Sequence, residues 1–271
     1  MRAALPSLVF CISLLPLSAA PAKPEPTEAE LQQIITKFSE KETEFLQARE
    51  QYTYRQTVSV EDFDGGGTPG GRFDLVSDIM IFNGKRTERI VRAPVSTIKF
   101  VTFSPEDEQD IRSVQPFVLN SMQLPKYHVR YLGREKLDEI DTLAFAVKPK
   151  EMVPGERYFS GIAWVDEQDL QIVKTYGRAT GKLKKGNDQR FPKFETFREQ
   201  IDGKYWFPIL TRADDTLYFE DSVVRLKMRV KYADYKKFTG ETKITFGDEV
   251  PSTPPGQPGQ PTTPPAPPKK P

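Results

Sequence analysis

The sequence predicts a mainly β protein, in which a meandering antiparallel sheet follows one N-terminal helix. Two observations predict this fold class. From residue 51 onward, Thr, Val, Tyr and Phe dominate short runs with a period of two, and turn residues separate the runs. Before that point, residues 27–48 repeat their apolar side chains with a helical period. One helix followed by many strands is typical of an α+β protein with an antiparallel sheet.

The helix has a clear start and one apolar face. Thr27 and Glu30 have the spacing of a capping box, in which each side chain bonds the backbone N–H of the other residue. The apolar side chains on one face are Leu31, Ile34, Ile35, Phe38, Phe45 and Leu46. We therefore expect this helix to lie on the apolar face of the sheet.

About eleven strands are predicted, several of them joined by tight turns. Asn83-Gly84 and Asp202-Gly203 favour two-residue hairpins, and residues 166–169 form an acidic turn. Residues 223–232 alternate between apolar and basic side chains, so one face is expected to be buried. Residues 72–83 are apolar on both faces, which predicts a second apolar layer, with the helix as one candidate. The predicted strands are 51–63, 72–83, 86–93, 127–137, 141–149, 157–166, 169–178, 192–201, 204–213, 216–220 and 223–235.

Both ends of the chain differ from the folded part. Residues 1–22 have the layout of a cleaved signal peptide, which predicts an exported protein without a transmembrane anchor in its mature form. The only cysteine, Cys11, lies in this leader. Residues 249–271 are rich in Pro and Gly and predict a disordered tail, either a solvated spacer or a Pro-rich ligand. One domain over residues 25–248 remains.

Charge and composition exclude some functions. Lys and Arg number 39 and Asp and Glu number 38, so the chain lacks the positive field expected of a nucleic-acid-binding protein. The mature chain has no thiol for a disulfide, a thiolate metal site or a cysteine nucleophile.

Residues 94–125 interrupt the strands. Ser104 followed by Pro105 and acidic residues is typical of a helix start. The apolar residues that follow are Ile111, Val114, Phe117, Val118, Leu119, Met122 and Leu124. This short helical insertion could act as a lid, or it could only plug one end of the sheet.

Few residues suggest catalysis, and we predict no catalytic residue, metal or cofactor. His128 is the only histidine and lies in a strand without a nearby nucleophile. The glycines of 65–72 lack the Lys-Ser/Thr of a phosphate loop and join two strands, which favours a hairpin loop. The acids of 106–110 lack calcium-loop spacing. The basic and aromatic residues of 184–198 favour a solvated loop over a polyanion or headgroup contact. A secreted hydrolase with two facing carboxylates stays open as an alternative.

Apolar side chains are more prominent in the predicted strands and the insertion than any reactive group. A curved sheet with a helix and an apolar insertion on its concave side can enclose a cavity for acyl chains, whose burial gains about 0.8 kcal/mol per methylene. Alternatively, these side chains only pack against one another.

Three short motifs stand out in the predicted strands: residues 161–174, GIAWVDEQDLQIVK; residues 82–90, FNGKRTERI; and residues 202–208, DGKYWFP. They resemble the outer-membrane lipoprotein carrier superfamily, which includes LolA, LolB and RseB-like periplasmic proteins. The first motif is similar to the recurrent G-x-x-W-[IV]-D hairpin of that superfamily, the second to its early strands, and the third to a late strand start. The resemblance implies a strongly curved antiparallel sheet, an incomplete β-barrel with an N-terminal helix and a short helical lid insertion across its open side.

The resemblance also implies a function. It indicates a periplasmic, non-enzymatic carrier or chaperone, monomeric, which holds a lipid or an acylated lipoprotein during transport to the outer membrane. The alternative is an RseB-like sensor or scaffold, whose sheet binds an envelope protein partner. No arginine latch of the family aligns, since Arg55, Arg89 and Arg92 are all candidates. The residues that would line the ligand cavity are Met80, Phe82, Phe117, Val118, Leu119, Met122, Ile162 and Trp164.

Overall fold

The computed structural model describes residues 23–104, 107, 110–111, 115–182 and 192–238. The predicted signal peptide and tail lie outside these residues. The described part consists of one long helix, one sheet of ten strands and a short 3-10 helix, and none of its helices is long and apolar enough to cross a membrane. The elements are α1 (Glu28–Arg49), β1 (Tyr52–Asp64), β2 (Pro69–Phe82), β3 (Lys85–Arg92), η2 (Leu124–Lys126), β4 (Tyr127–Leu137), β5 (Ile140–Pro149), β6 (Tyr158–Asp166), β7 (Ile172–Thr180), β8 (Phe194–Ile201), β9 (Tyr205–Tyr218) and β10 (Val223–Lys237).

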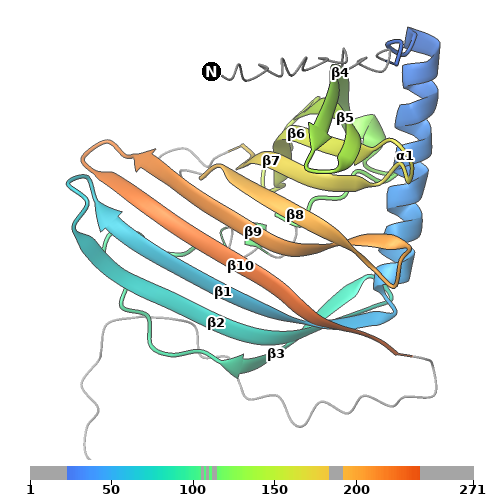
Figure 1. The fold of residues 1–271 in the computed structure, drawn as a ribbon. Coiled ribbons are helices and arrows are strands. Elements are labelled where there is room, and N and C mark those ends of the chain that lie inside the picture. The colour runs from blue at the N-terminus through green and yellow to red at the C-terminus, as the bar shows by residue number, and fades with distance from the viewer. Residues whose placement is uncertain (1–22, 105–106, 108–109, 112–114, 183–191, 239–271) are drawn as a thin grey trace, which may run out of the picture.

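The sheet is antiparallel, strongly curved and open (Figure 1). Its strand order is β3-β2-β1-β10-β9-β8-β7-β6-β5-β4, so β1 pairs with β10 and the edge strands β3 and β4 do not meet. This arrangement confirms the predicted fold class of an incomplete antiparallel barrel with an N-terminal helix.

The prediction of two strands at 204–213 and 216–220 was wrong, because the structure has one strand, β9, over this stretch. Asp214 and Asp215 do not form a turn but stay in register with Lys227 and Leu226 of β10. The Asp214 carboxylate accepts two hydrogen bonds from Arg225 at 2.7 Å. This neighbour compensates the acidic pair, which in the sequence alone favours a turn.

Helix α1 has the predicted capping box and lies on the inner face of the sheet, the face that also carries Phe103, Phe117 and Leu119. The ring of Phe38 contacts Phe145 of β5, with 5.5 Å between the ring centroids. The ring of Phe45 packs edge-on against Phe207 of β9 at 5.1 Å. Both phenylalanines are fully buried, so the helix covers one end of the inner face (Figure 1).

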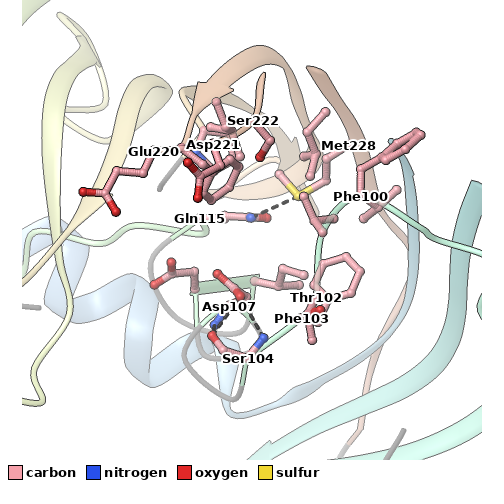
Figure 2. Close-up of a pocket in the computed structure, with 18 residues that line it drawn as sticks. Phe100, Thr102, Phe103, Ser104, Asp107, Gln115, Glu220, Asp221, Ser222 and Met228 are labelled. Atoms are coloured by element: carbon pink, nitrogen blue, oxygen red, sulfur yellow. Dashed lines mark hydrogen bonds between the residues drawn. The ribbon is translucent and has the colours of Figure 1, made fainter. Parts of the chain in front are cut away.

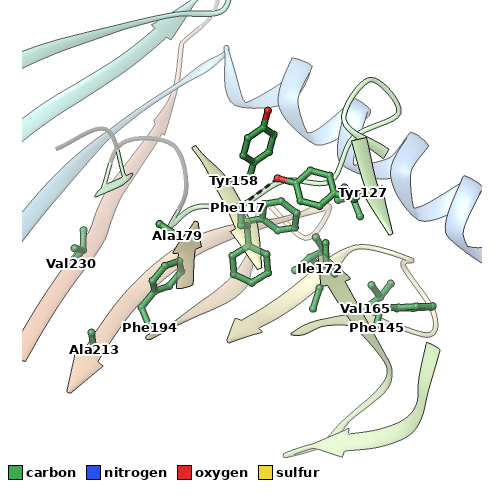
Figure 3. Packing of buried hydrophobic residues seen from close by; sticks show 14 of the residues in the cluster. Phe117, Tyr127, Phe145, Tyr158, Val165, Ile172, Ala179, Phe194, Ala213 and Val230 are labelled. Atoms are coloured by element: carbon green, nitrogen blue, oxygen red, sulfur yellow. Dashed lines mark hydrogen bonds between the residues drawn. The ribbon is translucent and has the colours of Figure 1, made fainter. Parts of the chain in front are cut away.

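The main core lies on this inner face. Strand β10 alternates as predicted, because Val224, Leu226, Met228, Val230 and Tyr232 are all buried and the intervening residues point outward. Figure 3 shows Phe117 of the insertion within this core, beside Tyr127 and Tyr158 of the sheet. A smaller apolar cluster of Ala144, Trp164 and Val173 lies on the outer face.

The outer side of β2 does not have the second apolar layer that its composition predicts. Residues Phe73, Leu75, Ile79 and Ile81 join or contact the core, but Phe82 is 57% exposed. Helix α1 packs on the inner face, and on the outward side of β2 Val76 and Met80 are half-buried while Phe82 is exposed.

Strand order explains where the insertion lies. Because β3 and β4 follow one another in the chain but lie at opposite edges of the sheet, the chain between them has to connect the two edges, and its described residues Phe103, Ile111, Phe117 and Leu119 pack on the inner face. The helix predicted from Ser104 falls partly on residues outside the described part.

Residues 65–68 form a hairpin turn between β1 and β2, as expected for this glycine-rich stretch.

Candidate functional site

The beginning of the insertion is fixed to the sheet by Asp62. This buried carboxylate of β1 accepts hydrogen bonds from the backbone N–H groups of Gly71, Lys99 and Phe100, at 2.7, 2.9 and 2.5 Å. Glycine is required at position 71, because a Cβ there would lie 1.7 Å from the carbonyl oxygen of Thr97. The insertion therefore lies directly on the backbone of β2.

The end of the insertion is fixed by a buried ion pair. The guanidinium of Arg198, on β8, donates hydrogen bonds to both carboxylate oxygens of Glu42, on α1, at 3.1 and 3.2 Å. It also donates to the carbonyl oxygen of Phe117. The Arg198 and Glu42 side chains are 1% and 0% exposed, so one pair connects helix, sheet and insertion out of contact with water.

This burial affects the carboxyl group of Glu42. Desolvation raises its pKa, while the charge of Arg198 and hydrogen bonds from Arg198 and the Ile172 N–H oppose the rise. The position is therefore stable only because every charged atom has a partner.

A first pocket, which we call the Phe100 pocket, lies between the insertion and the strands β1, β9 and β10 (Figure 2). It has a volume of about 590 Å³, within the range of about 300–1,000 Å³ that is usual for small-molecule sites. Its apolar lining residues are Val60, Phe100, Val101, Phe103, Ile111, Leu217, Phe219, Leu226 and Met228. They come from both the sheet and the insertion, so the pocket exists only where the two meet.

Polar groups lie around this apolar lining. The amide of Gln115 contacts the sulfur of Met228 at 3.3 Å, and Ser104 bonds the carboxylate of Asp107 at 2.8 Å (Figure 2). The β9–β10 turn contributes Glu220, Asp221 and Ser222. The pocket thus combines an apolar wall with hydrogen-bonding groups, as expected for a molecule with an apolar chain and a polar end.

A second pocket, which we call the Arg49 pocket, shares no lining residue with the Phe100 pocket and has a volume of about 730 Å³. Its apolar and aromatic lining residues are Leu46, Tyr54, Ile81, Pro116, Phe117, Val118, Tyr127 and Phe159. Its charged lining residues are Arg49, Arg86, Glu88, Glu156 and Arg157.

Three of the eight predicted cavity residues lie in the insertion on the inner face. Phe117 is stacked on Phe159, with 4.4 Å between the ring centroids, and both line the Arg49 pocket together with Val118. Leu119 is fully buried in the core. Met122 is 82% exposed.

The other four predicted residues point away from both pockets. In the register of β1, β2 and β3, Ile79 and Ile81 face inward, so Met80 and Phe82 face outward. In β6, Ala163 and Val165 belong to the inner core, so Ile162 and Trp164 lie in the outer cluster. There Trp164 donates its Nε1–H to Glu135 at 2.7 Å.

Sequence analysis missed Glu42, Arg198, Phe100 and Arg49. A signal existed for Glu42, which lies between Phe38 and Phe45 on the apolar face of the helix and so predicts a buried charge. A signal also existed for Arg198, which continues the inward alternation of Phe194 and Thr196. The partner of each charge lies 156 residues away, and no local pattern connects them.

The described residues provide little for catalysis. His128 is exposed on the edge strand β4. No group of three or more His, Cys, Asp or Glu residues among the described residues could hold a metal ion. The carboxylates Asp62 and Glu42 are fully engaged in holding the insertion, which is a structural task.

Comparison with known proteins gives similar solved structures. No family model matches the chain, and no curated protein matches it. A DUF1329 family protein from Desulfovibrio piger is 13% identical, with 77% of this chain and 93% of that one covered and a TM-score of 0.37. A LolA superfamily protein from Nitrosomonas europaea is 12% identical, with 76% and 93% covered and a TM-score of 0.32. The Pseudomonas aeruginosa MucA/MucB complex gives 8% identity, 74% and 100% covered and a TM-score of 0.20.

Proposed function

We propose that this protein is an exported, periplasmic binding protein without enzymatic activity, which carries a lipid or the acyl chain of a lipoprotein in the Phe100 pocket. The observation that supports this function is the pocket itself, because nine apolar side chains from the sheet and the insertion surround a space of about 590 Å³. The chemistry fits an acyl chain, since each methylene that leaves water contributes about 0.8 kcal/mol.

In this proposal the insertion is the lid of the pocket. Asp62 holds Phe100 and Arg198 holds Phe117, and in this proposal the described residues between them, such as Phe103, move over the ligand. Phe103 of the insertion packs on Phe73 of β2, with 5.0 Å between the ring centroids. A short thiol-reactive cross-link between Phe73→Cys and Phe103→Cys, in a mature chain without other cysteines, should slow ligand uptake. Uptake at an unchanged rate would exclude a moving lid.

The carrier function is tested with the mature protein and monoacylglycerols of increasing chain length, which have no charge. Each added methylene should lower Kd about fourfold until the pocket is full. Phe100→Ser should weaken binding by about tenfold or more, because Phe100 is 39% exposed at the pocket and its substitution spares the deep core. The matched control is Phe82→Ser, on the outer face, which should leave Kd unchanged.

Native mass spectrometry of the protein from an envelope fraction, followed by organic extraction, identifies what it carries in the cell. Copurifying lipid that is lost in Phe100→Ser but kept in Phe82→Ser would support the proposal. Kd values that do not depend on chain length, or that are equal in both variants, would refute it.

A second candidate function is an RseB-like sensor or scaffold that binds an envelope protein. The observation in its favour is the edge strand β3, which pairs only with β2 in the described sheet and exposes Ile90 and Val91 by 52% and 48%. Such an edge can accept a strand from a partner protein. Capture of one envelope protein by the wild type and by Leu132→Lys, at the other edge, but not by Ile90→Lys, would favour this function.

A further inference from the structure

Arg49, the last residue of α1, is a cation without a hydrogen-bond or ion-pair partner among the described residues. No hydrogen bond or ion pair joins its guanidinium to a described residue, and its Nε is buried without an acceptor. The guanidinium carbon lies 5.9 Å from the centroid of the Phe45 ring. Burial lowers the pKa of Arg49.

The neighbouring charges do not compensate Arg49. Glu42, the buried carboxylate one helical repeat earlier, is bonded to Arg198, and the guanidinium of Arg198 lies 5.1 Å from the same Phe45 ring. Two arginines therefore share one carboxylate in this part of the protein. Glu50, the next residue, accepts the N–H of Gly84 at 2.8 Å instead.

The other cations of the Arg49 pocket have partners. Arg86 donates to Glu88 at 2.5 Å and to Gln56 at 2.8 Å, and Arg157 is paired with the carboxylate of Asp110. Arg49 is therefore the cation of this lining that has no hydrogen bond to a described carboxylate. Tyr54, in the same lining, adds a phenolic donor.

The position of Arg49 at the end of α1 compensates only part of the cost of burying its side chain. A cation at a helix C-terminus gains about 0.3–1 kcal/mol from the helix dipole, and a contact with one aromatic ring contributes a similar amount. Neither interaction satisfies the buried Nε–H, which costs about 1–3 kcal/mol when it has no acceptor. Because Arg49 lines the pocket, an anion there would give its guanidinium an acceptor.

We propose that the Arg49 pocket is a second binding site, which takes an amphiphile with an acidic head group, a carboxylate or a phosphate ester. The head group accepts hydrogen bonds from the planar guanidinium of Arg49, and the apolar chain lies against Phe117, Val118 and Phe159. This site shares no lining residue with the Phe100 pocket, and neither proposal depends on the other.

The test compares ligands of one chain length with different head groups: decanoate, decyl phosphate and uncharged decanol. Isothermal titration at neutral pH should show that the mature protein binds the two acids about 10- to 100-fold more tightly than decanol, as expected for hydrogen bonds to a charged group. Arg49→Gln should remove this preference and leave the Kd of decanol unchanged. Arg49→Lys, which keeps the charge but loses the planar fork, should retain part of it.

Two control variants locate the effect. Arg229 is an exposed arginine on the outer side of β10, and Arg229→Gln should keep the preference for acids. Phe100→Ser changes the other pocket and should keep it as well. Equal Kd values for acids and decanol in the wild type would overturn this proposal even if Arg49→Gln did not fold. An unchanged preference in folded Arg49→Gln, or no binding of either acid, would also overturn it. The chain-length dependence of monoacylglycerols is unaffected by any of these results and tests the carrier function separately.

Discussion

Removal of Arg198 should be among the most damaging single changes to this protein. Arg198→Met deletes the partner of Glu42, whose side chain is 0% exposed, and leaves a buried carboxylate without a counter-charge. Breaking such a pair costs about 3–5 kcal/mol of the free energy of unfolding. Arg198→Met also removes the hydrogen bond to the Phe117 carbonyl. An unsatisfied buried acceptor costs about 1–3 kcal/mol, and this cost is included in the range above.

A double-mutant cycle separates the ion pair from general packing. Glu42→Leu with Arg198→Met removes both charges, so the double variant should be less destabilised than Arg198→Met alone, by about 1 kcal/mol or more. The control is Arg225→Met on the surface, where Arg225 bonds Asp214 with both side chains about half exposed. It should cost less than about 1 kcal/mol.

The loss should also depend on pH. Burial raises the pKa of Glu42 above its unfolded value, so the contribution of this carboxyl group to stability is present at low pH and is lost as pH rises through the folded pKa. Without Arg198 the folded pKa rises further. The cost of Arg198→Met should therefore be larger at about pH 7.5 than at about pH 5.

Urea denaturation followed by tryptophan fluorescence measures these free energies, with Trp164 and Trp206 as the two reporters. A cost of Arg198→Met below about 1 kcal/mol, or a double variant whose cost equals the sum of the two single costs, would refute the buried ion pair as the anchor of the insertion.

Three further predictions use the same assay. Gly71→Ala should lower the free energy of unfolding by about 2 kcal/mol or more, because its Cβ would lie 1.7 Å from the Thr97 carbonyl oxygen. Gly66→Ala, whose Cβ would lie 3.4 Å from the Asp64 carboxylate, should leave the stability almost unchanged. Equal losses in the two variants would contradict the close approach of the insertion to Gly71. Phe38 is fully buried against Phe145, so Phe38→Ala should lower the free energy of unfolding by about 3–5 kcal/mol, whereas Phe82→Ala on the outer face should lower it by well under about 1 kcal/mol. Similar losses in the two variants would contradict a core on the inner face. The hydrogen bond from Arg55, with a second from Arg89, lowers the pKa of Asp78, so the stabilisation by this carboxylate is present above the unfolded pKa and is lost as pH falls through the folded pKa. Asp78→Asn should therefore be less stable than wild type by under about 1 kcal/mol near pH 7 and equal to it near pH 3. A difference in stability that does not depend on pH would exclude the ion pair of Asp78 with Arg55.

The local sequence determined most of the secondary structure of this protein. The capping box of Thr27 and Glu30 marks the start of α1, and the two-residue turns at Asn83-Gly84 and Asp202-Gly203 have positive φ at both positions, as such hairpins require. The alternation of residues 223–232 predicts the buried face of β10 correctly. These features depend on neighbours within a few residues, and the sequence contains all of the necessary information.

The positions of the candidate site residues depended on the tertiary structure. Residues 158–166 are apolar on both sides of the strand, so their alternation does not say whether Trp164 or Val165 faces the core. That choice follows from the register with β5 and β7, which places Val165 inside and Trp164 outside.

The order of the strands had the largest consequence. Pairing of β1 with β10 leaves β3 and β4 at the two edges, and the chain between them crosses the inner face, where it forms one wall of the Phe100 pocket and one wall of the Arg49 pocket. The ion pair of Glu42 with Arg198, which holds this crossing in place, joins residues 156 positions apart. Period and turn chemistry act over a few residues and therefore determine the strands, whereas pockets and buried charge pairs depend on contacts between distant segments that only the folded chain brings together.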